Sequence, residues 1–130
     1  PLKSKQLQKG LQELGEEGAI QVFENLATGN LLLGAVGVLQ FEVVAQRLQT
    51  EYKVDAIFEP ADINTARWLT FPDEVTRKNF EREQQHRMAK DVDGNYVYLA
   101  STRYNLDVTR EKWTKVGFHA SREHGQKLSN

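Results

Sequence analysis

Apolar residues recur at helical spacing in the first part of the chain. Leu7, Leu11 and Leu14 stand four and three positions apart among Lys, Gln and Glu. This spacing puts the three side chains on one side of an amphipathic helix. The pattern predicts a helix that begins at Leu2 and ends near Gly15 or Gly18, because glycine commonly follows the last helical residue.

A β-hairpin is predicted next. In the stretch 19–25, Ile20 and Val22 fall on one face of a strand and Phe23 on the other. The turn formers Thr-Gly-Asn at 28–30 then lead into the apolar run LLLGAVGV at 31–38. Because this second run is continuously apolar, we expect a central strand that is covered on at least one face.

A second helix and a returning strand complete the first half. The helix is predicted over 38–52, where helical spacing relates Phe41, Val44, Ala45, Leu48 and Tyr52. After it, apolar and other residues alternate until Pro60, which predicts a strand over 53–60.

The second half is predicted to contain three strands and two helices. In chain order these are a strand at 65–70, a polar helix from Pro72 to about Ala89, a turn at Asp93-Gly94, a strand at 95–101, a short helix at 106–113 capped by Asn105, and a final strand at 116–121. No linker rich in Pro, Gly or Ser divides the chain, so residues 1–130 are expected to form a single domain. The fold class is α+β, an antiparallel or mixed sheet with packed helices whose first half is ferredoxin-like in layout.

Composition narrows the classes of function. The chain has 130 residues, of which 39% are hydrophobic and 27% charged, and it has no cysteine. Disulfides, thiolate zinc sites, iron–sulfur clusters and a cysteine nucleophile are therefore excluded. No stretch approaches the roughly 20 apolar residues that span a bilayer, so we expect no membrane partner and a cytoplasmic location.

No nucleotide-binding or metal-binding motif is present in the sequence. Gly10 and Gly15 have the glycine separation of a phosphate-binding P-loop, but Glu16 stands where that motif requires Lys. The spacing of the histidines and carboxylates matches neither a zinc site nor a calcium loop. We therefore expect no cofactor or metal in this chain and no catalytic residue.

Cations alternate with aromatic residues in the second half. Residues 65–130 carry 12 Lys and Arg against 9 Asp and Glu, whereas residues 1–64 carry 5 against 9. Guanidinium groups that bind phosphates and aromatic faces that stack on bases are typical of RNA-binding surfaces. The alternative is that the aromatic residues belong to the core and their basic neighbours are merely solvated. The candidate RNA-facing residues are Arg67, Trp68, Arg103, Tyr104, Arg110, Lys112, Trp113 and Lys115.

The segment LLLGAVGVLQFEVVAQRLQTEYKVDAIFEP carries a resemblance to a known family. Its strand, Gly-x-x-Gly turn, helix and following strand resemble the third domain of elongation factor G. The match is more specific to the C-terminal domain of bacterial peptide chain release factor 3, a family of translational GTPases, and it extends over the whole chain. The residues that fit the pattern are Gly34, Gly37, Leu39, Phe41, Glu42, Val43, Arg47, Leu48, Glu51 and Tyr52.

The resemblance implies a non-catalytic domain of a larger translation factor. A GTPase domain and a β-barrel domain would lie upstream, and GTP or GDP with Mg²⁺ would bind only there. The expected partners are the ribosome, through rRNA and ribosomal protein, and the upstream domains of the same factor. The parent factor would promote the release of class I release factors from the ribosome.

Two other functions stay open at this point. One is a small-molecule-binding or enzymatic α+β domain with a pocket near the Gly34–Leu39 junction, for which a deep pocket lined by polar groups would be the sign. The other is a domain that mainly contacts its own upstream domains, for which an exposed apolar patch would be the sign.

Overall fold

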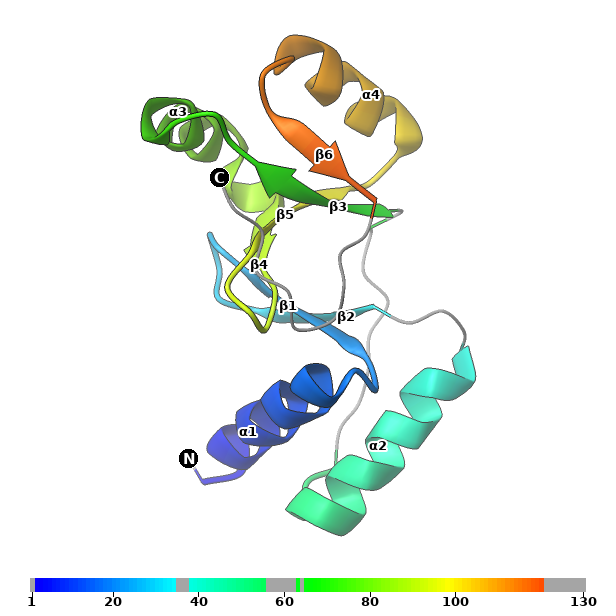
Figure 1. The fold of residues 1–130 in the computed structure, drawn as a ribbon. Coiled ribbons are helices and arrows are strands. Elements are labelled where there is room, and N and C mark those ends of the chain that lie inside the picture. The colour runs from blue at the N-terminus through cyan, green and yellow to red at the C-terminus, as the bar shows by residue number, and fades with distance from the viewer. Residues whose placement is uncertain (1, 35–37, 56–62, 64, 121–130) are drawn as a thin grey trace.

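The computed structural model describes residues 2–34, 38–55, 63 and 65–120 and has an α+β fold, as the sequence predicts (Figure 1). The helices are α1 (Leu2–Glu17), α2 (Val38–Tyr52), α3 (Glu74–Gln84) and α4 (Arg103–Lys112), with a short 3₁₀ turn η1 (Gln85–Arg87). The strands are β1 (Gln21–Asn25), β2 (Leu31–Gly34), β3 (Thr65–Thr70), β4 (Met88–Lys90), β5 (Tyr96–Ala100) and β6 (Gly117–His119).

The six strands that the structure describes join one antiparallel sheet in the order β2-β1-β4-β5-β3-β6. Within the described part of the chain, β2 pairs only with β1 and therefore lies at an edge. The expectation of a central strand at 31–38 was wrong, and all four β2 residues are half-buried. The apolar side chains of β2 are covered by helices on one face and by the inner side of the sheet on the other. Because a central strand is also covered on both faces, a continuous apolar run does not distinguish the two positions.

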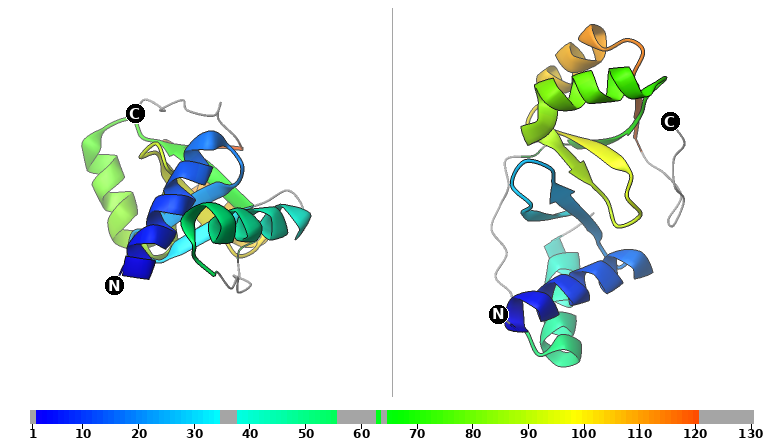
Figure 2. Two further views of the ribbon diagram at one scale, coloured as in Figure 1. Left: turned by 90° about the horizontal axis from the view of Figure 1, so that it is seen from below. Right: turned by 90° about the vertical axis from the view of Figure 1, so that its left-hand side faces the viewer.

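The helices form two layers at opposite ends of the molecule (Figures 1 and 2). Helices α1 and α2 pack on each other and on the β1–β2 hairpin, while α3 and α4 lie side by side over the other end of the sheet. The order α1–β1–β2–α2 follows the predicted first half. The strand predicted over 53–60 falls mostly outside the described residues.

The contact between α1 and α2 depends on close approach and on one guanidinium. A Cβ built on Gly10 would stand 2.7 Å from Cδ2 of Leu48, so the two helices meet at a position where only glycine fits without a shift. Arg47 of α2 donates to Glu17 of α1 at 2.6 Å and to Glu51 at 2.7 Å. These hydrogen bonds hold the pKa of both carboxyls below the ordinary value.

Helix α1 ends where the sequence predicts. Gly18 has φ 87°, and its N–H donates to the carbonyl of Gly15, while the N–H of Ala19 donates to the carbonyl of Leu14. These bonds satisfy carbonyls at the end of the helix, and the positive φ favours glycine at this position.

The polar helix of the second half is shorter than predicted. Helix α3 ends at Gln84, and the expected continuation to about Ala89 was wrong, because Met88 and Ala89 belong to strand β4 and are fully buried. Strand β4 pairs with β1 on one side and with β5 on the other. Strand β4 therefore joins the two halves of the sheet. Although it directly follows a helical segment in sequence, its burial between two strands favours the extended conformation.

The cap of α4 also differs from the prediction. The helix begins at Arg103, and the Thr102 side chain accepts a hydrogen bond of 3.0 Å from the N–H of Asn105. Asn105, predicted to be the cap, lies in the first turn and donates through Nδ2 to Oγ of Ser101. The turn predicted at Asp93-Gly94 and the strands at β3, β5 and β6 are confirmed.

Candidate nucleic-acid interface

Helix α4 presents one face to the core and the opposite face to solvent. Leu106 and Thr109 are buried, and the Oγ1 of Thr109 lies 3.0 Å from the phenol oxygen of Tyr98 on β5. On the opposite face, Tyr104 is 74% exposed and Val108, one turn later, is 46% exposed. The packing of the inner face therefore fixes which side chains point outward.

Arg103 and Arg110 lie on one flank of α4. They are seven residues apart, which is two helical turns, and both are exposed. Lys112 lies on the other flank, where it pairs with Glu83 of α3. The two arginines therefore stand on the flank that faces away from α3. Between them, Asp107 accepts from Nε of Arg103 at 3.5 Å, the upper limit for a hydrogen bond.

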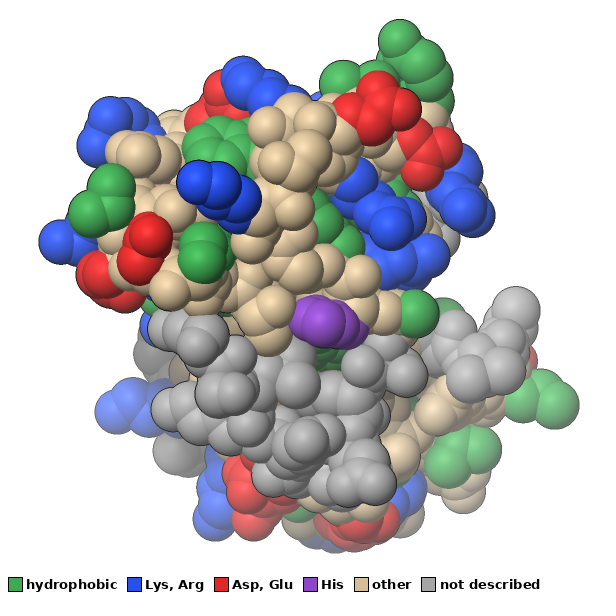
Figure 3. Space-filling model, turned by 45° about the horizontal axis from the view of Figure 1, so that its top comes forward, with side chains coloured by type: hydrophobic (Ala, Val, Ile, Leu, Met, Phe, Trp, Pro, Cys, Tyr) green, Lys and Arg blue, Asp and Glu red, His purple; other side chains and the backbone are tan. Residues whose placement is uncertain are grey.

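Arg67 lies on the same side of the sheet as α4. Its cross-strand neighbour on β5 is Tyr98, which bonds to α4, and directly opposed residues share a face of the sheet. The guanidinium donates to Oγ1 of Thr65 at 2.7 Å, and Thr65 pairs with Ala100, three residues before Arg103. Arg67 is thereby held near the start of α4. At the end of the molecule that carries α3 and α4, Figure 3 shows Lys and Arg side chains gathered on the right.

Lys112 and Trp113 form a clamp between α4 and α3. Both donate to the carboxylate of Glu83, Lys112 to Oε1 and Nε1 of Trp113 to Oε2 at 2.9 Å. The Trp113 ring meets Phe80 edge to face at 5.2 Å. The bond from Lys112, and then the bond from Trp113, lower the pKa of Glu83. Both side chains thus have a structural role in joining the helices.

Trp68 belongs to the core. It is buried, its Nε1 donates to Oδ2 of Asp91 at 2.9 Å, and its ring lies against Phe23. The sequence left open whether the aromatic residues are core or surface, and the structure divides them. Trp68 is buried, Trp113 is half-buried against the cluster beneath α3 and α4, and Tyr104 faces solvent.

Lys115 stands apart from the α4 flank. It is exposed in the segment between α4 and β6, close enough to Asp73 for its charge to contribute to the lowered pKa of that carboxyl. Hydrogen bonds from Thr76 are the larger cause. Val108 was not among the residues singled out from sequence, although its position four residues after Tyr104 could have identified it.

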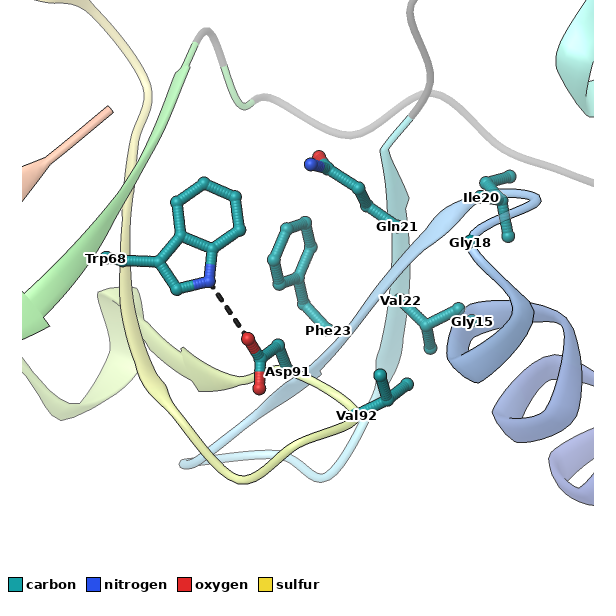
Figure 4. A pocket seen from close by; sticks show the side chains of 9 residues that line it. All are labelled: Gly15, Gly18, Ile20, Gln21, Val22, Phe23, Trp68, Asp91 and Val92. Atoms are coloured by element: carbon teal, nitrogen blue, oxygen red, sulfur yellow. Dashed lines mark hydrogen bonds between the residues drawn. The ribbon is translucent and has the colours of Figure 1, made fainter. Parts of the chain in front are cut away.

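A small pocket lies away from this surface, between the end of α1 and the β4–β5 turn (Figure 4). Its volume is about 190 Å³, below the range of about 300 to 1,000 Å³ of ligand sites. Its carboxylate, Asp91, accepts from Trp68, from the N–H groups of Asp93 and Asn95 and from the Asn95 amide. The carboxylate of the pocket thus holds the turn together. The pocket predicted near the Gly34–Leu39 junction falls largely on residues outside the described ones.

The described ranges contain neither a metal-binding cluster nor a membrane-spanning helix. Over these residues, no cluster of three His, Asp or Glu side chains is arranged to hold a metal ion. Among the helices described, none combines the length and the apolar character needed to cross a membrane.

Comparison with known proteins finds one family and a close relative. The family model described as class II release factor RF3, C-terminal domain, matches residues 1–110. A peptide chain release factor 3 from Aromatoleum aromaticum is 81% identical over 129 residues, which are 99% of this chain. The chain spans 23% of the length of that relative.

Proposed function

The chain belongs to the family of C-terminal domains of the class II release factor RF3, and from this premise we propose that it is a non-catalytic ribosome-docking domain of a translation-termination factor. In this role it helps a longer GTPase to promote the departure of class I release factors from the ribosome in the cytoplasm. GTP or GDP and Mg²⁺ bind to the GTPase domain of that longer protein.

One observation carries the docking proposal. The outer surface of α4 and the adjacent part of β3 combine Arg67, Arg103, Arg110 and the exposed Tyr104 in a chain whose net charge is −1. Neither Arg67 nor Arg110 forms an ion pair with another described residue. Two guanidiniums without an ion pair, beside a third whose bond to Asp107 is long at 3.5 Å, favour phosphate as the partner in a molecule of net negative charge. We call Arg67, Arg103, Tyr104 and Arg110 the α4 surface, and Lys115 is proposed as a peripheral contact.

A second face supports contact with the rest of the longer factor. On α2, Leu39 is 73% exposed and Val43, one turn later, is 55% exposed. Two large exposed apolar side chains on adjacent turns are a feature of contact surfaces. In the relative, the part outside the match is more than three times as long as this chain, so other domains are available for such a contact. We assign this pair to an upstream domain. In the longer factor, Leu39→Ser with Val43→Ser is expected to lower the melting temperature, whereas in the isolated chain the same pair is expected to leave it unchanged.

Sedimentation with ribosomes over a salt series tests the docking proposal. Arg103→Glu with Arg110→Glu in the longer factor is expected to weaken binding and to reduce its dependence on salt, because fewer counterions are released. The matched control is Lys5→Glu with Lys9→Glu, which reverses two exposed cations on α1, at the other end of the molecule. Equal binding and an equal salt slope in the two variants would overturn the proposal that the domain docks through α4.

A further inference from the structure

We infer that Tyr104 is a base-stacking residue and that the α4 surface binds RNA in which bases are unpaired. This inference rests on the proposed docking function and names the form of its partner. The cations supply attraction to phosphates in any nucleic acid, so the distinction between single-stranded and double-stranded RNA depends on the aromatic ring.

Tyr104 differs from every other tyrosine of the chain. In the other three tyrosines the phenol oxygen lies within hydrogen-bonding distance of another side chain. The pairs are Tyr52 with Glu13, Tyr96 with Arg77, and Tyr98 with Thr109. Tyr104 forms no hydrogen bond and no ring contact with another described residue, and it is 74% exposed. The fold therefore makes no use of this ring. An aromatic ring that is held on a packed helix and uncovered is available for stacking, at little cost in conformational entropy.

The surroundings of the ring fit a strand of RNA. Arg103 adjoins Tyr104 in the chain, and Arg110 follows two turns further along the axis, about 10 Å at 1.5 Å per residue. Val108 lies beside the ring on the next turn and extends its apolar face. A stacked base would lie over Tyr104 and Val108, and the phosphates on either side would meet the two guanidiniums.

The shape of this surface favours unpaired bases over a duplex and over a protein. In an A-form duplex the base faces are stacked inside, so Tyr104 could reach none of them. A protein–protein interface of ordinary size buries about 800 Å² of surface on each partner and has an apolar centre. On α4 the exposed large apolar side chains are Tyr104 and Val108, and charged residues surround them.

Fluorescence anisotropy with labelled RNA tests the inference. The probes are a single-stranded uridine decamer and a duplex formed from the same decamer and its complement, both at low salt. Tyr104→Ala is expected to weaken decamer binding by about 5-fold to 100-fold, the range typical of one stacked base. Duplex binding should change by less than about 2-fold, because the phosphate contacts persist.

Two control variants separate stacking from other effects. Tyr104→Phe keeps the ring and is expected to retain decamer binding. Val75→Ala removes an apolar side chain of α3 that is 68% exposed and is expected to change neither affinity. Unchanged melting temperatures will show that the variants are folded.

The outcomes distinguish this inference from the docking proposal. Equal losses for decamer and duplex in Tyr104→Ala, or no decamer binding by the unaltered chain, would overturn the stacking role. If Tyr104→Ala reduced sedimentation with ribosomes but left decamer binding intact, the partner would be an acidic protein surface, and docking through α4 would stand. Docking itself fails only if reversal of Arg103 and Arg110 leaves sedimentation unaltered.

Discussion

The ring of Phe23 lies 6.0 Å from the ring of Trp68, although strands β4 and β5 separate their strands in the sheet. Three strand spacings in a flat sheet amount to about 14 Å. The sheet must therefore curl so that β1 and β3 approach each other across its concave side. The cluster formed by Phe23, Trp68, Ala89, Val97 and Leu99 fills that side, and the helices cover the outer faces.

Coupling between the two rings should be measurable. We expect Phe23→Leu and Trp68→Phe to destabilise the fold non-additively, with a coupling energy of about 0.5 to 1.5 kcal/mol in a double-mutant cycle from urea denaturation. As a control, Phe23→Leu is combined with Phe71→Leu, whose ring lies in the separate cluster beneath α3 and α4. Coupling of equal size in both cycles would mean that the ring contact contributes nothing of its own.

The clamp on Glu83 predicts a dependence of stability on pH. Because hydrogen bonds from Lys112 and Trp113 lower the pKa of Glu83 from 4.5, the clamp stabilises the fold fully above that pH. Its contribution is lost as the pH falls through the lowered pKa of the folded state. We expect the difference in unfolding free energy between the unaltered chain and Glu83→Gln to be constant near neutral pH and to shrink below pH 4.5.

Denaturation with urea between pH 3 and pH 7 will measure this difference. Glu111→Gln is the matched control, since Glu111 is an exposed carboxylate on α4 for which the structure gives no ion pair. The control should show no comparable trend. A difference for Glu83→Gln that stays constant down to pH 3 would contradict the role of the clamp.

The cap of α4 gives a third prediction. Thr102→Ala removes the side-chain oxygen that accepts from the N–H of Asn105 and is expected to lower the unfolding free energy by about 1 kcal/mol. Thr102→Ser keeps the oxygen and should cost much less. If the alanine variant were as stable as the serine variant, the first turn of α4 would be held by other contacts.

The two aromatic residues near α4 should respond in opposite ways to truncation. Trp113→Ala is expected to cost about 2 kcal/mol or more, because it removes the contact with Phe80 and the bond to Glu83. Tyr104→Ala should change stability by no more than about 0.5 kcal/mol. Thermal denaturation of the two variants will show whether the surface and core assignments hold.

The chain itself should bind no nucleotide. Gly10 and Gly15 lie inside α1, where Gly10 packs against Leu48 and Gly15 against Val92 and Val22, so neither belongs to a phosphate-binding loop. Titration calorimetry with GTP and Mg²⁺ is expected to give no heat of binding. Binding at micromolar concentration would reveal a phosphate site that the sequence motifs do not describe.

Long amphipathic elements could be predicted from the sequence, and short buried ones could not. Helices α1 and α2 each carry an apolar stripe over four turns, which only a helix can place on one side. Strand β4 has three residues, too few for an alternation to be visible, and its identity depends on pairing with β5 across a turn and with β1, which lies far away in sequence. Thr102 and Asn105 are both common caps, so the start of α4 was ambiguous by three residues.

The candidate surface could be predicted only as a set of possibilities. Composition identified Arg103, Tyr104 and Arg110, but it identified Trp68 and Trp113 in the same way, because an Arg or Lys neighbour does not reveal on which side of a strand or helix an aromatic ring lies. The burial of Trp68 follows from the curl of the sheet, and the partial burial of Trp113 follows from the position of α3. Both are tertiary relationships between distant segments.

The separation of the core into clusters has a consequence for the order of folding. The buried residues between α1, α2 and the first hairpin all fall between Leu11 and Leu48, whereas the cluster around Phe23 extends to Leu99. A chain synthesised from its N-terminus can therefore complete the first helical layer before β4 exists. Until β4 is synthesised, the edge of β1 that later pairs with β4 is open and able to pair with another chain. Strand β4, only three residues long, thus covers the edge of β1 as well as joining the two halves of the sheet.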